Sequence, residues 1–157
     1  MKNTSQPAPT ARTFVDPQHP PLVLELIKAL DWFEESLRSM QEARGMQSVT
    51  RPQAQLLAHV AMGERRAARI ARKLGLTRQT IASVINELVE LGILTVERDP
   101  QDARAQLVDF SVEHARQGPQ LLALFKEAED HVASVIGADR LAVVRHALSM
   151  DWGTVDR

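Results

Sequence analysis

Cysteine is absent from the 157-residue chain. This absence excludes disulfide bonds, thiolate metal sites, cysteine nucleophiles and cysteine-based redox sensing. Tyrosine is absent as well, and the only aromatic residues are four phenylalanines and two tryptophans. So few rings argue against a platform that stacks the bases of single-stranded RNA.

Long apolar runs are also missing. None approaches the ~18 residues that a membrane-spanning helix needs, and the N-terminus lacks the apolar core of a secretory signal. We therefore expect a cytoplasmic protein without a membrane partner. The chain has neither a phosphate-binding glycine loop nor a nucleophile elbow, so we expect no enzyme and no cofactor. The five histidines include no pair at the i, i+4 spacing of a helical metal site, and we expect no metal within one chain.

The length and the composition, with 44% apolar and 25% charged residues, are those of one soluble globular domain. The net charge of −1 hides an uneven distribution. Residues 51–104 carry nine basic and six acidic side chains, whereas residues 1–50 and 105–157 are both net acidic. Within residues 51–78 there are seven basic side chains and one acid. This basic segment indicates a local contact with a polyanion, and a solvated helix face is the alternative.

The N-terminal part divides at residue 21. Residues 1–21 hold five prolines and few apolar side chains, which predicts a flexible tail. From Leu22 to Arg44 apolar residues recur at the spacing of one helix face, and Gly45 ends the pattern. Trp32 lies off this stripe, so we expect a second face of this helix to be covered, by another subunit.

Three shorter helices follow, over residues 51–62, 65–74 and 78–91. Thr77 is placed to cap the last of them, and Gly75 permits the tight turn before it. Two short helices joined by a glycine turn, the second with polar side chains on its free face, are typical of a helix-turn-helix.

The next segment predicts a β-hairpin. Residues 93–98 and 106–110 are rich in β-branched and alternating residues, and a polar, turn-rich loop of seven residues, 99–105, separates them. Helical character returns at Val112, with a kink or a fresh start at Pro119, and a last helix follows Gly137. The expected fold is mainly α with a small β-hairpin wing.

Two stretches of this pattern resemble the MarR (multiple antibiotic resistance) family of regulators. Residues 74–94 look like the recognition helix of that family with its flanks, in the sequence LGLTRQTIASVINELVELGIL. Residues 97–104, ERDPQDAR, are similar to the family's wing signature. The two motifs occur together at the separation that the family shows.

The resemblance implies a homodimeric winged helix-turn-helix regulator, a repressor that binds a near-palindromic site in double-stranded DNA and is released by a small molecule. It assigns DNA binding to residues 49–111. It assigns dimerisation to the helix within residues 22–48 and to the helices of residues 112–157.

The residues of the second helix of the motif suit the major groove, which accepts one α-helix and there presents all four base pairs distinctly. Arg78 can pair with guanine, and Gln79 or Asn86 with adenine, through two hydrogen bonds each. Short side chains suited to phosphate or base contacts near the positive helix N-terminus are Thr77, Thr80 and Ser83.

On the wing, Arg104 can enter a narrow, electronegative minor groove. We expect Asp102 to support the wing, by bracing Arg104 or by capping the turn. Arg98 contacts a phosphate or pairs with Asp99. In the preceding helix Arg66 is the expected contact to the DNA backbone. Its basic neighbours are expected on a solvated face, and they are Arg65, Arg69, Arg72 and Lys73.

Two departures from the family pattern support an alternative. Ser83 and Ala103 stand where many members of the family have a basic residue. Together with the acidic total, they allow a winged-helix module that contacts proteins and binds no specific DNA. The polar free face of the 78–91 helix favours DNA, because a protein-binding face has an apolar centre. A regulator that responds to no ligand is a further alternative.

Overall fold

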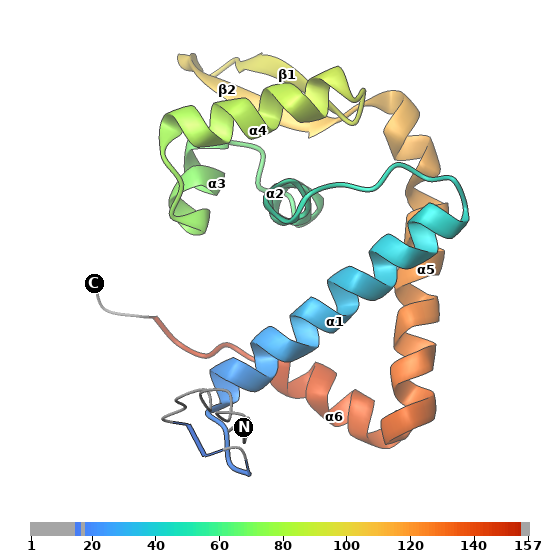
Figure 1. Ribbon diagram of the computed structural model, residues 1–157. Helices are drawn as coiled ribbons and strands as arrows, with labels where there is room; N and C mark the ends of the chain where they lie inside the picture. Colours follow the sequence, from blue (N-terminus) through green and yellow to red (C-terminus); the bar gives the residue numbers. More distant parts are fainter. Residues whose placement is uncertain (1–14, 17, 155–157) are drawn as a thin grey trace, which may run out of the picture.

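The computed structural model describes residues 15–16 and 18–154, without the side chains of residues 103 and 104. Most of the predicted N-terminal tail therefore lies outside the described residues. The elements, shown in Figure 1, are α1 (Leu22–Ala43), α2 (Arg51–Ala61), α3 (Ala67–Leu74), α4 (Arg78–Glu90), β1 (Leu94–Asp99), β2 (Asp102–Phe110), α5 (Val112–Ile136) and α6 (Ala138–Ser149). This mainly helical fold with one antiparallel hairpin confirms the predicted fold class.

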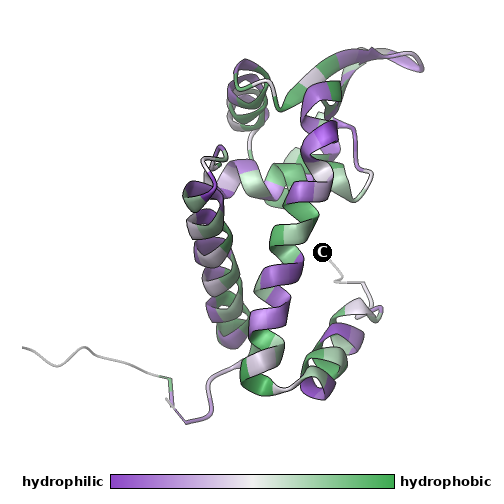
Figure 2. Cartoon of the chain, turned by 90° about the vertical axis from the view of Figure 1, so that its right-hand side faces the viewer, coloured by the Kyte–Doolittle hydropathy of each residue, from purple (hydrophilic) through white to green (hydrophobic). Residues whose placement is uncertain are grey.

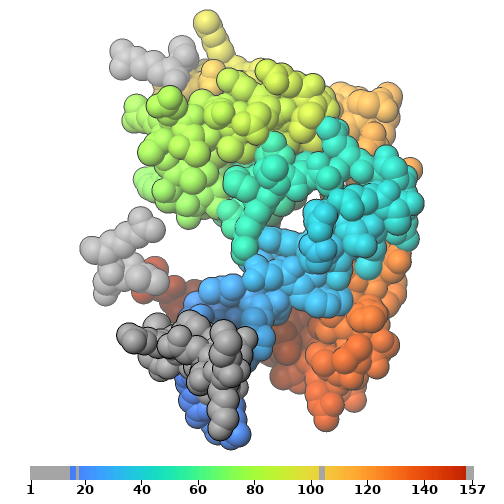
Figure 3. Space-filling model, in the orientation of Figure 1, coloured from blue at the N-terminus to red at the C-terminus, as the bar shows by residue number. Residues whose placement is uncertain are grey.

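The elements form two parts, which we name the winged unit and the helical frame. The winged unit comprises α2, α3, α4 and the hairpin, and the helical frame comprises α1, α5 and α6 (Figure 1). In the space-filling view the two parts meet on the right-hand side, and open space separates them on the left (Figure 3).

The core of the winged unit comes from the inner faces of its helices and from the hairpin. Leu56 of α2, Ile70 of α3 and Leu88 of α4 are fully buried against Val108 of β2. The periodicity of the sequence places all three helical residues on inward faces. The helical frame buries far less, and its fully or nearly buried side chains are Leu124 and Ala128 of α5.

One helix boundary differs from the prediction, and one of the two predicted alternatives at Pro119 is excluded. The third helix begins at Ala67, because Arg66 forms a β-bridge with Leu107 and the Arg65 carbonyl accepts the Val108 N–H at 2.8 Å. These two residues are extended beside β2 and cannot be helical. No fresh start occurs at Pro119, because α5 runs through it as one helix.

The wing differs from the predicted hairpin with its seven-residue loop. Strand β2 begins at Asp102, and the chain reverses through Pro100 and Gln101 alone. Asp at the first position and Pro at the second favour such a turn, and the Asp99 Oδ1 atom accepts the Gln101 N–H at 2.9 Å. The register then shifts between Arg98, which pairs with Gln106, and Asp99, which pairs with Asp102. Residues 103–105 thus form a bulge in β2 rather than a loop.

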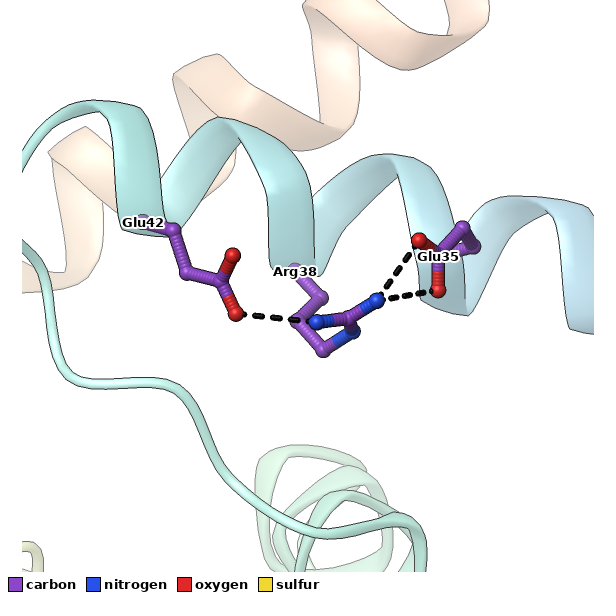
Figure 4. A network of polar contacts seen from close by, with 3 residues as sticks. All are labelled: Glu35, Arg38 and Glu42. Carbon is purple, nitrogen blue, oxygen red and sulfur yellow. Dashed lines mark hydrogen bonds and ion pairs between the residues drawn. The ribbon is translucent and has the colours of Figure 1, made fainter.

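The helical frame carries polar and apolar faces side by side, as the alternating colours of its helices in Figure 2 show. On the side of α1 turned away from α5, Arg38 donates to both carboxylate oxygens of Glu35 at 2.6 Å and to Glu42 at 3.0 Å (Figure 4). These hydrogen bonds lower the pKa of Glu35. Along the rest of the frame, large apolar side chains are exposed at Val23, Leu24, Ile27, Leu30, Trp32, Val143, Val144 and Leu148. No helix within the described ranges is both long and apolar enough to cross a membrane.

Candidate nucleic-acid interface

The turn between α3 and α4 is set by local chemistry. Gly75 adopts a φ of +67°, which is open to glycine but strained for other residues. The Leu76 N–H returns to the Ala71 carbonyl at 2.9 Å and closes the end of α3. Thr77 Oγ1 then accepts the Thr80 N–H at 3.1 Å, as the predicted cap requires.

Helix α4 presents one polar face to solvent above an apolar face that is buried. Its buried residues are Ile81, Val84, Ile85 and Leu88. The side chains predicted to contact DNA are all on the exposed side, and they are Arg78, Gln79, Thr80, Ser83 and Asn86, with the cap Thr77 beside them. The apolar face anchors α4 to the winged unit, so these polar groups are held on a rigid element.

A buried ion pair holds the wing against α3. The Asp99 side chain is only 4% exposed, and one of its carboxylate oxygens lies 2.6 Å from Arg66 Nη2. This close contact is an ion pair rather than a well-aligned hydrogen bond. The Gln101 N–H lowers the pKa of Asp99, and so does the Arg66 guanidinium, against the opposing effect of burial. Asp99 is therefore held as a carboxylate at the turn of the wing.

This pair excludes one predicted alternative and gives Arg66 a structural role besides its predicted contact to the DNA backbone. For Arg98 the two predicted alternatives were a phosphate contact and a pair with Asp99. Arg66 pairs with Asp99 instead and Arg98 is exposed, so the second alternative is wrong and the first stays a prediction. Arg66, expected only as a backbone contact, joins α3 to the wing. Neither point is visible in the sequence, because the bridge between Arg66 and Leu107 joins distant segments.

The remaining wing residues stay predictions. Asp102 is exposed at the start of β2, and its N–H donates to Asp99. Arg104 belongs to β2, and its side chain lies outside the described part of the structure.

A groove of about 890 Å³ lies between α3, α4 and the wing. We name it the arginine groove after its lining residues Arg66, Arg69, Arg72, Arg78 and Arg98. The other basic side chains of residues 65–74 are neutralised outside it. Arg65 lies 2.8 Å from Asp109, and Lys73 lies 3.4 Å from Glu64.

Four arginines of the groove have no carboxylate within ion-pair distance among the described residues, and they are Arg69, Arg72, Arg78 and Arg98. Helical periodicity places Arg69 and Arg72 on an exposed face, and the structure shows that this face lines the same groove as the wing. Cationic groups that no carboxylate pairs at this distance can attract a polyanion at this site. Within the described residues, no three His, Asp or Glu side chains are grouped to hold a metal ion.

The wing is joined to α5 through a short packed segment. The Ser111 hydroxyl donates to the Gly92 carbonyl at 2.6 Å and accepts the His114 N–H at 3.1 Å. The His114 ring stacks on Phe110 with centroids 5.6 Å apart. Burial lowers the pKa of His114, so the neutral imidazole is favoured.

Comparison with known proteins agrees with this architecture. The model of the MarR family matches residues 47–105, which include α2, α3, α4, β1 and the start of β2. No curated protein of similar sequence was found.

Solved structures match nearly the whole chain. The transcriptional regulator PA4135 matches with a TM-score of 0.67 and 19% identity, over 83% of this chain and 94% of that one. PcaV of Streptomyces coelicolor, solved in complex with its natural ligand, matches with a TM-score of 0.59 and 27% identity. The match covers 87% of this chain and 94% of PcaV. Wild-type MarR of E. coli in its apo form matches with a TM-score of 0.65 and 17% identity. The match covers 82% of this chain and 94% of MarR. Residues 47–105 therefore match the MarR family, and most of the chain has the winged-helix fold of these solved transcriptional regulators.

Proposed function

We propose that the chain is a regulator of transcription that binds a specific sequence of double-stranded DNA. The observation that carries this proposal is one continuous surface. The exposed polar face of α4 borders the arginine groove, where four guanidinium groups have no carboxylate partner among the described residues. A polar helix face reads bases, and free cations next to it bind phosphates.

The proposed contacts divide by their chemistry. Arg78 pairs with guanine, and Gln79 and Asn86 pair with adenine, in the major groove. Thr77 and Thr80 lie at the helix N-terminus, where the helix dipole favours a phosphate. Contacts of the wing and of α3 to phosphates or the minor groove come from Arg66, Arg98 and Arg104, with Asp102 supporting the wing.

We further propose that the helical frame forms a homodimer. Neither α1 nor α6 has a buried residue, although both carry large apolar side chains. Ile27 is 45% exposed, and Leu148 is 51% exposed. Burial of such surface against a second copy is favourable. A two-fold dimer would present two copies of α4 about 34–36 Å apart, one turn of DNA, and would bind a near-palindromic site.

We also propose that the protein represses transcription and that a small molecule releases it from DNA. The support is the likeness to PcaV, which was solved with its natural ligand. A screen for compounds that raise the melting temperature tests this point, because a ligand that binds only the folded state stabilises it. A regulator without a ligand would show no shift with any compound, and its DNA binding would depend on its abundance.

The experiment for DNA recognition is selection of genomic fragments by the purified protein, followed by sequencing. We expect fragments that share a motif with two-fold symmetry. The double variant Gln79→Ala/Asn86→Ala should lose this enrichment, whereas the control Gln117→Ala/Gln120→Ala, on the exposed surface of α5, should retain it. Absence of any shared motif for the wild-type protein would refute specific DNA binding and favour the protein-contact module.

A further inference from the structure

A hydrogen bond on the outer face of α4 determines what Ser83 can offer to DNA. The Ser83 Oγ atom lies 3.2 Å from Glu87 Oε1. An ionised carboxylate has no proton to give, so the serine hydroxyl is the donor. A hydroxyl has one proton and two lone pairs. Once its proton points at Glu87, Ser83 presents only lone pairs to a neighbouring molecule.

The position of Glu87 is itself fixed by a buried amide. Gln53 of α2 is 6% exposed, and its Nε2 atom donates to Glu87 Oε2 at 2.9 Å. The orientation of this amide is unambiguous, because its Oε1 atom accepts the Thr50 N–H at 2.9 Å and a backbone N–H can only donate. Glu87 therefore accepts a hydrogen bond from Gln53 on one oxygen and from Ser83 on the other.

We propose that Ser83 is a specificity-determining residue that accepts a hydrogen bond from a base amino group, cytosine N4 or adenine N6. These are the two donor groups that bases expose in the major groove. Guanine O6 and N7 and thymine O4 are acceptors there, and each would face the lone pairs of Ser83 without a proton between them. The inference rests on the proposed function and names what one side chain of α4 reads.

The negative charge of Glu87 also favours a base amino group at this place. Glu87 is exposed on α4, and no basic side chain lies within ion-pair distance of it among the described residues. A carboxylate repels phosphates but accepts well from the amino group of cytosine. The pair Ser83–Glu87 thus forms an acceptor surface beside the donors of Arg78, Gln79 and Asn86.

The test is binding-site selection from a random pool of duplexes with the full-length wild-type protein and its variants. The wild-type site should contain, in each half, one position where cytosine or adenine on one strand is preferred over guanine and thymine. The preference should be about fivefold or more, the low end of the cost of one mismatched base pair. Which of the two amino bases dominates distinguishes cytosine from adenine. Ser83→Ala should lose the preference at this position alone, and Ser83→Thr, which keeps the hydroxyl, should retain it.

A second variant changes which hydrogen bonds Ser83 can form with DNA. In Glu87→Gln the oxygen of the introduced amide must face the Nε2 atom of Gln53, so its NH₂ group faces Ser83. The serine oxygen then accepts, and its proton becomes free to donate to DNA. Because one lone pair of Ser83 also stays free, the preference for cytosine or adenine at this position should weaken, and guanine or thymine should be accepted there. Glu90→Gln is the matched control, because it removes the same charge from α4 and leaves the Ser83–Glu87 bond intact.

The outcomes separate this inference from the proposed function. If the wild-type protein selects a site and neither Ser83→Ala nor Glu87→Gln changes its base preferences, the inference is overturned and DNA recognition stands. If Glu87→Gln and Glu90→Gln both raise overall affinity without altering any position, Glu87 acts through its charge alone and the inference is again overturned. If the wild-type protein selects no site, the proposed function fails and the inference falls with it.

Discussion

Arg98 offers a direct test of the proposal that the arginine groove binds DNA. Its side chain is exposed on β1, lines the groove and has no carboxylate partner among the described residues. Arg98→Gln removes one positive charge and no internal contact, so the free energy of unfolding should change by less than about 0.5 kcal/mol. Any loss of DNA affinity then reports on a phosphate contact.

The magnitude follows from counterion release. Each phosphate neutralised by a protein cation contributes about −0.9 to the slope of log K against log salt. With one Arg98 in each protomer of the proposed dimer, the slope should be shallower by about 1.8 in the variant. Between about 50 and 200 mM salt, the wild-type affinity should fall about 12-fold more than that of Arg98→Gln.

Fluorescence anisotropy with a labelled duplex at four or five salt concentrations measures both slopes. Lys126→Gln on α5 is the control, because it causes the same change in net charge at an exposed site outside the groove. Its slope should equal that of the wild type. Equal slopes for Arg98→Gln and the wild type would show that Arg98 touches no phosphate, and equal losses for both variants would reduce the effect to net charge.

Four further predictions concern the fold and the assembly. Asp99→Asn should speed amide exchange in the hairpin, and because the folded-state pKa of Asp99 is lowered, its contribution to stability is present at neutral pH and lost as the pH falls below about 3.9. Burial lowers the pKa of His114, so the contribution of its neutral imidazole to the stability of the fold is complete above the ordinary pKa of 6.5 and lost as the pH falls below it. The melting temperature of the wild type should therefore drop more on acidification than that of His114→Gln. Leu88→Ala, at a fully buried site, should cost about 2–5 kcal/mol in denaturant unfolding, and Val89→Ala, at a site 41% exposed, far less. Sedimentation of the wild type should give twice the 17.5 kDa of one chain, and Leu148→Asp should give one chain, whereas unchanged masses would place the dimer contact elsewhere.

The features that the sequence predicts well are those with local causes. The apolar spacing of α4, its Thr77 cap and the glycine turn at Gly75 each act within a few residues, and all three are confirmed. The presence of the hairpin is likewise encoded in alternation and turn residues. The exposed side of α4 follows from the same periodicity, so its polar face could be predicted residue by residue.

The features that the sequence does not reveal depend on contacts between distant segments. The bridge from Arg66 to Leu107 shortens α3, and the ion pair between Arg66 and Asp99 joins α3 to the turn of the wing. Gln53 and Glu87 are 34 residues apart, and nothing local indicates that one orients the other. The continuity of α5 through Pro119 has a different cause. The carbonyl that loses its partner is that of Ala115, which is exposed and can bond to water.

The central claim is that the polar face of α4 and the arginine groove bind a specific DNA sequence. The most direct test titrates the purified protein against the intergenic DNA upstream of its own gene, with an unrelated duplex of equal length as control, at low and moderate salt. The account predicts tighter binding to the upstream duplex and a steep loss of affinity with salt. Absence of binding to either duplex at low salt would contradict it, because four arginines that have no carboxylate partner in the described part of the chain should attract even non-specific DNA.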